Sequence, residues 1–268
     1  MRFWNDKVAL VTGGSSGLGR AIADAFAAAG AKVIIAALEA DAVDAAVKAI
    51  CSAGGEAAGY QADLTRQEDV QRVFAQAIAR FGRLDVLVNN AGRSVRGAVL
   101  DTTPEQFREL LELNFLSAVR CTRAAAEELL KRRGHVVNIG SLASKAAARW
   151  VGAYPATKFA LAAYSQQLRL ELGPRGLHVL LVCPGPIQRA APRLYALEGA
   201  ERVPESARLP GAGVRLKAVS PSKLSAMILQ ACRRRQAELV VPGRTRLLFA
   251  LSQLWPDLGD WIISRKSG

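Results

Sequence analysis

The stretch Thr12-Gly13-Gly14-Ser15-Ser16-Gly17-Leu18-Gly19 follows a short apolar run and precedes a segment of helical composition. Glycines at 13, 17 and 19 permit a tight turn, a close approach of the backbone to a pyrophosphate, and close packing of a helix on a strand. The free N–H groups at the start of that helix and the hydroxyls of Ser15 and Ser16 suit phosphate oxygens. The stretch therefore predicts a phosphate-binding turn between the first strand and the first helix.

On both sides of this turn, short aliphatic runs alternate with longer alanine-rich segments. The runs expected to form strands are 8–11, 32–36, 60–63, 86–88, 135–139 and 178–182. Most are apolar throughout, which is typical of parallel strands buried on both faces. The pattern predicts an α/β fold: one domain over residues 1–268, built on a doubly wound parallel sheet with helices on both faces. Pro184 to Pro221 breaks the rhythm, and we expect a loop excursion over about residues 186–220.

Composition and charge narrow the functional classes. The chain carries 36 Lys and Arg against 23 Asp and Glu, a net charge of +13, but the charge is scattered and accompanies no nucleic-acid-binding motif. The four cysteines are far apart and form no metal-like cluster with the two histidines, so no metal site is expected. With neither a signal-like segment nor a long apolar run, the expected location is the cytoplasm.

Further motifs follow the turn in a fixed order. They are Asp63 after the third run, Asn89-Asn90-Ala91-Gly92 after the fourth, then Asn114, Ser141, the pair Tyr154 and Lys158, and Pro184-Gly185. Each is weak alone. Together with Thr12 to Gly19, they resemble the short-chain dehydrogenase/reductase family in its single-domain branch.

The resemblance implies a Rossmann-type fold, a nicotinamide dinucleotide, and a homodimer or homotetramer. It assigns cofactor contacts to Thr12, Gly13, Ser15, Ser16, Gly17, Leu18, Gly19, Asp63, Leu64, Asn90, Ala91, Gly92, Tyr154, Lys158, Pro184, Gly185 and Ile187. It assigns catalysis to Asn114, Ser141, Tyr154 and Lys158, with Asn114 in a water-mediated proton relay to Lys158. The activity it implies is hydride transfer between the nicotinamide and a carbonyl or secondary alcohol.

The residue types suit this chemistry. A phenol, as on Tyr154, can donate the proton that a reduced carbonyl oxygen needs, and a nearby ammonium favours the phenolate and lowers the phenol pKa from about 10. Lys158 lies four residues on, and therefore on the same face of a helix. Ser141 follows an apolar strand and can hydrogen-bond the substrate oxygen. His135 and His178 stand at strand starts, at the opposite end of the sheet, and are interpreted as structural.

The choice between NADP and NAD is poorly marked. An acidic residue at the end of the second strand would bind the ribose of NAD, and an arginine nearby would accept the phosphate of NADP. Ala37 and Leu38 stand roughly there, and Glu39 comes one or two residues late. We favour NADP, because no acidic residue is clearly placed there and the protein is basic. A threonine common in the family's Pro-Gly motif is also missing, and Gln188 is a candidate substitute.

The substrate is expected to be a small molecule, and we favour a hydrophobic ketone or secondary alcohol. Its expected surroundings are Arg93, Leu142, Ala143, Trp150 and the 186–220 excursion, in which Leu194, Tyr195, Leu197 and Leu209 are apolar candidates. Packing of the loop alone explains the apolar residues equally well. An amphipathic segment over about residues 244–263 could dock on a membrane, cover the cleft or pack against a second subunit; we favour packing or an interface.

Three other functional classes compete with an oxidoreductase. A dinucleotide-binding regulator without catalysis would not need Asn114, Ser141, Tyr154 and Lys158 together. A sugar-nucleotide epimerase or dehydratase shares the Tyr-xxx-Lys pair, but is usually longer and has a different glycine spacing. A membrane-surface binding protein would rest on the charge and the C-terminal segment alone.

Overall fold

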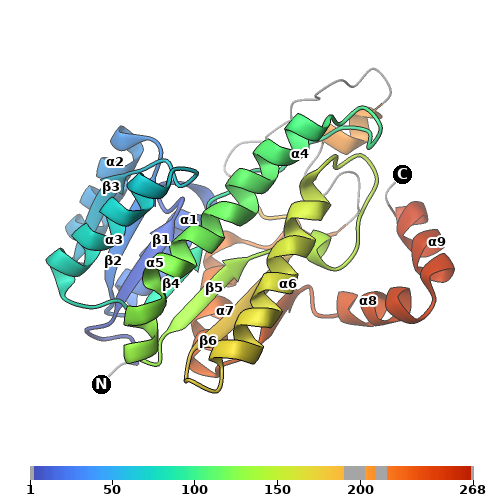
Figure 1. The fold of residues 1–268 in the computed structure, drawn as a ribbon. Coiled ribbons are helices and arrows are strands. Elements are labelled where there is room, and N and C mark those ends of the chain that lie inside the picture. The colour runs from blue at the N-terminus through green and yellow to red at the C-terminus, as the bar shows by residue number, and fades with distance from the viewer. Residues whose placement is uncertain (1–2, 190–202, 209–215, 267–268) are drawn as a thin grey trace.

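The computed structural model describes residues 3–189, 203–208 and 216–266. Its centre is a seven-stranded sheet in the order β3-β2-β1-β4-β5-β6-β7, parallel at every pairing. The strands are β1 (Val8–Thr12), β2 (Lys32–Ala37), β3 (Ala57–Gln61), β4 (Val86–Asn89), β5 (His135–Ile139), β6 (His178–Pro184) and β7 (Glu238–Val241). This confirms the predicted Rossmann-type α/β sheet (Figure 1).

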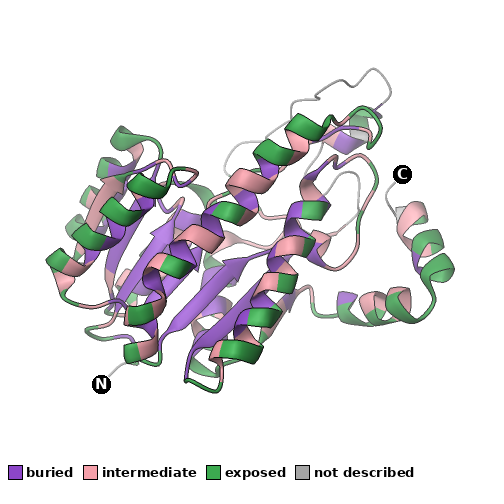
Figure 2. Ribbon diagram, in the orientation of Figure 1, coloured by how far each residue is buried: buried purple, intermediate pink, exposed green. Residues whose placement is uncertain are grey.

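Helices cover both faces of the sheet. One layer consists of α1 (Gly17–Ala28), α2 (Ala40–Ser52) and α7 (Pro221–Arg233), and the other of α3 (Gln67–Phe81), α5 (Ser117–Lys131) and α6 (Tyr154–Leu172). Successive strand residues point to opposite layers: Ala9 and Val11 join the first core, Val8 and Leu10 the second. Because both faces are covered, the central strands are buried throughout (Figure 2).

The third strand lies earlier than predicted. It spans Ala57–Gln61, not residues 60–63, and pairs with β2 from Val33 to Ala37. Its first three residues are Ala57, Ala58 and Gly59, which lack the β-branched character that marks the other strands. β3 forms at the sheet edge because β2 offers a hydrogen-bonding partner, so tertiary pairing overrides local propensity here.

Short helical segments follow β4, β5 and β6. Helix α4 (Pro104–Leu111) runs through one turn of π-helix, Glu112–Leu116, into α5. Two 3-10 turns, Leu142–Ser144 and Glu205–Arg208, follow β5 and β6 respectively. After β7 the chain forms α8 (Thr245–Leu254) and α9 (Pro256–Lys266), which pack on each other and stand apart from the helices that cover the sheet (Figure 1).

Candidate functional site

The glycine-rich turn has the backbone that the sequence predicts. Gly13 and Gly17 have φ of +61° and +54°, a region that favours glycine. A β-carbon on Gly19 would overlap the Gly13 carbonyl oxygen and the Asn90 side chain, so a side chain there would displace the turn. Ser16 begins α1 without a side-chain cap, and no acidic residue lies in the first turn. The amino end of α1 is therefore open to an anion.

Thr12 fastens this turn to the end of β4. Its hydroxyl oxygen accepts hydrogen bonds from the backbone N–H groups of Asn90, at 2.9 Å, and Ala91, at 3.0 Å, and the hydroxyl donates to the Val88 carbonyl at 3.2 Å. The Asn90 side chain donates in return to the carbonyls of Thr12 and Gly13. The two motifs thus form one rigid cradle at the carboxyl end of the sheet.

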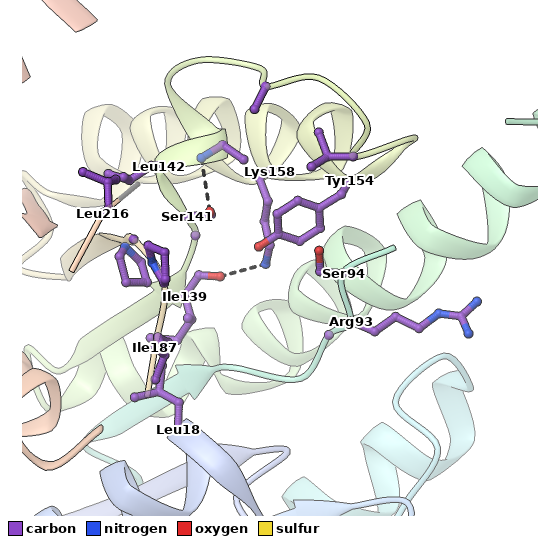
Figure 3. A pocket seen from close by; sticks show the side chains of 18 of the residues that line it. Leu18, Arg93, Ser94, Ile139, Ser141, Leu142, Tyr154, Lys158, Ile187 and Leu216 are labelled. Atoms are coloured by element: carbon purple, nitrogen blue, oxygen red, sulfur yellow. Dashed lines mark hydrogen bonds between the residues drawn. The ribbon is translucent and has the colours of Figure 1, made fainter. Parts of the chain in front are cut away.

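Tyr154 and Lys158 stand together at the start of α6. Pro155 occupies the first turn, where its missing N–H costs little, and Lys158 follows Tyr154 by one turn. The Lys158 Nζ lies 5.7 Å from the centre of the Tyr154 ring and donates to the Ile139 carbonyl at 2.9 Å. Figure 3 shows the two side chains side by side. Burial lowers the pKa of Lys158 to about 8.

Ser141 lies where β5 ends and the Leu142–Ser144 turn begins. Its hydroxyl oxygen accepts from the Ala143 N–H at 3.1 Å, and Ser144 Oγ accepts from the Ser141 N–H at 3.1 Å. This reciprocal cap fixes the position of the Ser141 side chain. Because the cap uses the oxygen as an acceptor, the hydroxyl hydrogen can still be donated to another oxygen.

Asn114 sits in the π-helical turn and is buried. Its side chain accepts from the Arg93 N–H at 2.8 Å and donates to the Arg93 carbonyl at 2.9 Å and to Thr157 Oγ1 at 3.1 Å. It therefore holds the segment after β4 against α6. A β-carbon on Gly92 would lie 2.7 Å from Asn114 Oδ1 and 3.9 Å from Lys158 Nζ, so the absence of a side chain there keeps the space between Asn114 and Lys158 open.

A cavity of about 1390 Å³ brings most of these residues together. Of the residues predicted for catalysis or cofactor binding, it is lined by Gly13, Ser16, Gly17, Leu18, Gly19, Asn90, Ala91, Gly92, Ser141, Tyr154, Lys158, Pro184, Gly185 and Ile187. Thr12, Ser15, Asp63, Leu64 and Asn114 are not among its lining residues. Thr12 and Asn114 lie behind the lining residues and hold them in place through the hydrogen bonds given above.

Asp63 and Leu64 have partners inside the protein. Asp63 Oδ1 accepts from the N–H and the hydroxyl of Thr65, at 2.9 and 2.7 Å, and its own N–H donates to Asp69. Leu64 is buried in the core beneath α3. Both therefore shape the turn between β3 and α3, whatever else they contact.

The substrate side of the cavity agrees with the sequence in part. Arg93, Leu142 and Ala143 line it. Trp150 is not among the lining residues, whereas the nearby Ala148 and Val151 are. Leu194, Tyr195, Leu197 and Leu209 lie outside the described residues. The lining also includes two residues that were not expected, Ser94 and Arg96, together with Leu216 from the 186–220 excursion and Arg244, Thr245, Leu248, Ile263 and Arg265. The last five belong to the C-terminal segment, which thus borders the site.

The amino end of the sheet holds a cluster that sequence spacing did not reveal. Ligand atoms of His135, His178 and Cys232 lie within 4.8 Å of one another, which corrects the expectation that the cysteines form no metal-like cluster with the histidines. His178 Nε2 lies 2.8 Å from the Gln236 carbonyl and must donate to it, so His178 Nδ1 accepts from His135 Nδ1 at 2.9 Å.

Burial keeps this cluster neutral. It lowers the pKa of His135 to about 3 and of His178 to about 4, and it raises the pKa of the Cys232 thiol to about 12. The histidines therefore satisfy each other at the starts of β5 and β6, in the structural role expected of them.

Comparisons of the sequence and the fold with known proteins identify similar oxidoreductases. The family model for short chain dehydrogenases covers residues 7–193. An uncharacterized oxidoreductase of Methylorubrum extorquens is 38% identical over 196 residues, covering 73% of this chain and 79% of its own. A short-chain dehydrogenase from Streptomyces avermitilis superposes with a TM-score of 0.80 at 36% identity, over 95% of this chain and 96% of the other. A metagenomic short-chain oxidoreductase solved with NADP gives 0.72 at 28% identity, over 88% and 97%.

Proposed function

Because the chain belongs to the short-chain dehydrogenase/reductase family, we propose that it transfers a hydride between a nicotinamide dinucleotide and a carbonyl or secondary alcohol. The observation that carries this proposal is the buried Lys158 ammonium beside Tyr154, in a cavity that also reaches the open amino end of α1. One cavity thus joins an anion cradle to an acid–base pair. The metagenomic relative was solved in complex with NADP, which supports the proposal that this chain binds a nicotinamide dinucleotide.

The cradle fits a pyrophosphate. The glycines leave room for backbone approach, and the first turn of α1 offers N–H groups without a competing carboxylate. When bound, the nicotinamide supplies or accepts the hydride. Gly13 to Gly19 would hold the phosphates, Asn90 to Gly92 would line the middle of the cleft, and Pro184, Gly185 and Ile187 would lie at its far end.

The chain's own residues handle the proton. In the reducing direction, the Tyr154 phenol donates its proton to the carbonyl oxygen as the carbon gains the hydride, and the product is the alcohol. The Lys158 ammonium stabilises the phenolate left behind, and Ser141 donates a hydrogen bond to the same substrate oxygen. Asn114 then belongs to the relay that returns a proton through Lys158, across the space that Gly92 leaves open.

The proposed cofactor is NADP, with NAD as the alternative. At the end of β2, Ala37 is buried, Leu38 is 59% exposed, and Glu39 precedes α2 with its side chain exposed. Neither Ala37 nor Leu38 offers a carboxylate that would repel the extra phosphate, and the chain carries a charge of +13. Titration with NADPH and NADH, followed by nicotinamide fluorescence, should give tighter binding of NADPH.

A matched pair of variants sharpens this titration. Ala37→Asp should shift the preference toward NADH, because the new carboxylate can bind the ribose hydroxyls and repel the phosphate. Glu39→Gln should leave both affinities unchanged. If Glu39→Gln weakens NADH binding instead, Glu39 supplies the ribose contact and NAD is the cofactor. Binding of neither dinucleotide by folded protein would overturn the proposed function.

The proposed substrate is a hydrophobic carbonyl compound or alcohol. The cavity lining includes apolar side chains from several segments, namely Leu142, Val151, Leu216, Leu248 and Ile263, beside Arg96, Arg244 and Arg265. Figure 3 shows Leu142 and Leu216 together on one side, while the Arg93 side chain points away from Tyr154. A panel of ketones of increasing chain length should show kcat/KM rising with length. A strong preference for small charged ketones would contradict this.

A further inference from the structure

The last two helices expose an apolar surface. We call α8 and α9 the C-terminal hairpin. Five of its large apolar side chains are exposed: Leu247 by 80%, Leu254 by 71%, Trp255 by 60%, Leu258 by 41% and Trp261 by 52%. Exposed apolar side chains gathered on two adjacent helices, two tryptophans among them, are typical of an interaction surface.

Other residues of the hairpin border the active-site cavity. Thr245, Leu248 and Ile263 line the cavity that holds Tyr154, and the exposed Arg265 reaches its rim from the end of α9. The two helices meet at Gly259, where a β-carbon would lie 2.6 Å from the side chain of Ser252, so they can approach closely. The hairpin therefore borders the active-site cavity with some residues and exposes others, and Figure 2 shows many exposed positions along α8 and α9.

The charge of the hairpin selects among partners. Residues 244–266 contain four basic residues, Arg244, Arg246, Arg265 and Lys266, and two acidic residues, Asp257 and Asp260. The whole chain carries a net charge of +13. The Arg265 guanidinium lies 4.2 Å from the centre of the Trp261 ring, which places a cation beside an exposed aromatic. The basic residues outnumber the acidic ones, so the hairpin carries a net positive charge. An anionic lipid surface complements both this charge and the exposed apolar side chains, whereas a second copy of the hairpin would carry the same net charge.

The length of the helices sets how they could meet a bilayer. Helix α8 has 10 residues and α9 has 11, whereas a spanning helix needs about 20. Among the helices of the described residues, none combines the length and the apolar character needed to cross a membrane. A short helix with tryptophan and leucine on one side and arginine nearby can instead lie in the plane of the headgroups.

We propose that the C-terminal hairpin binds an anionic membrane surface, and that this contact brings the cavity bordered by Leu248 and Ile263 next to the lipid. The hairpin lies in the interface with Leu254, Trp255, Leu258 and Trp261 among the acyl chains. The second half of the proposal rests on the proposed function, because it identifies the apolar substrate as a molecule dissolved in the membrane. The first half is independent of catalysis.

Flotation with vesicles tests the contact directly. The full chain should float with vesicles of phosphatidylglycerol and phosphatidylcholine, and float less in high salt, because screening weakens the attraction. Trp255→Ala with Trp261→Ala should reduce the bound fraction roughly tenfold, since both rings leave the interface. NADPH titration of the same protein checks that the dinucleotide cradle is intact, so failure of the hairpin proposal and failure of the proposed function are distinguishable.

The chain offers a matched control. Leu254 in the hairpin and Leu170 on α6 are both 71% exposed. Leu254→Ser should weaken flotation several-fold, and Leu170→Ser should leave it unchanged, because only the first residue lies on the proposed surface.

Three outcomes would overturn the proposal. They are failure of the folded protein to float with anionic vesicles, an equal loss for Leu254→Ser and Leu170→Ser, and a change of oligomeric state on gel filtration for Leu254→Ser alone. The last would assign the surface to a second copy of the chain.

Discussion

Strands β5 and β6 bury titratable side chains at both ends, but the two ends do different work. At the amino end His135 and His178 face each other, and at the carboxyl end Lys158 donates to the last carbonyl of β5. Burial lowers the pKa of all three. Lys158 lines the cavity described above, whereas the two histidines are buried against each other, with Trp4 beside His135. A shifted pKa therefore reports burial, and it indicates chemistry only where a ligand can reach the group.

Replacing Tyr154 should have the largest effect, and it tests whether the carboxyl end is the reactive one. Tyr154→Phe removes the proton donor, so we expect kcat to fall by about 10²- to 10⁴-fold. Steady-state kinetics of ketone reduction measures this. Tyr60→Phe is the control, because Tyr60 lies on β3 and its hydroxyl donates only to the Gln76 carbonyl, at 3.3 Å. If kcat of the Tyr154→Phe enzyme stayed within tenfold of the parent, Tyr154 would not be the proton donor, and the carboxyl end would not be shown to be the reactive one.

Low pH should destabilise the protein through the histidine pair at the amino end of the sheet. The pKa values of His135 and His178 are lowered from 6.5 to about 3 and about 4, so the unfolded chain takes up protons first. Stability is complete above pH 6.5 and falls as the pH drops toward 4, by about 1.4 kcal/mol per pH unit for each histidine, or about 4 kcal/mol for both at pH 5. Urea unfolding at pH 7.5 and pH 5 measures the difference.

A double variant identifies the source of that slope. His135→Leu with His178→Leu removes both titrating imidazoles together, so that neither histidine remains without its hydrogen-bonding partner. Its stability should depend less on pH over the same range. An unchanged slope would show that the histidine pair is not responsible.

Lys158→Met should separate function from stability at the carboxyl end. The pKa of Lys158 is lowered from 10.5 to about 8, so its contribution to stability is complete above 10.5 and is lost as the pH falls through 8. At neutral pH the buried ammonium costs about 3 kcal/mol, and methionine removes that cost. The unpaired Ile139 carbonyl offsets about 1–3 kcal/mol of the gain.

We therefore expect the Lys158→Met protein to be as stable as the parent or more so, with hydride transfer reduced about 10²-fold. Thermal melts and kinetics on one preparation measure both. In the parent, kcat/KM for reduction should fall as the pH rises through about 8, since the ammonium is then lost. A variant destabilised by several kcal/mol would mean that Lys158 holds the fold together.

Thr12→Val should have the smallest effect and tests the rigidity of the cradle. Valine matches threonine in shape, but it leaves the N–H groups of Asn90 and Ala91 without their acceptor. We expect a loss of about 2 kcal/mol in urea unfolding, with weaker NADPH binding. Unchanged binding would show that the turn holds its form without this hydroxyl.

The sequence predicts what is local and periodic. Tyr154 and Lys158 share a face because they are one helical turn apart, and the glycine spacing specifies the turn before α1. Tertiary proximity is a different matter. Cys232 lies beside His135 although almost 100 residues separate them, and Arg265 reaches the cavity of Tyr154 from the last helix. No periodicity encodes such contacts, because they depend on strand order and on how the final helices pack.

The contact between Thr12 and Asn90 also bears on how the chain folds. The two residues are 78 positions apart, and the chain between β1 and its neighbour β4 contains β2, β3 and their helices, with the two strands on the other side of β1. A chain still emerging from the ribosome can form the strand and helix around Gly13 early, but it lacks the residues that close the cradle until Asn90 has been added. Such long-range pairings form late and slowly. A dinucleotide would therefore bind and stabilise only chains whose first four strands have already joined.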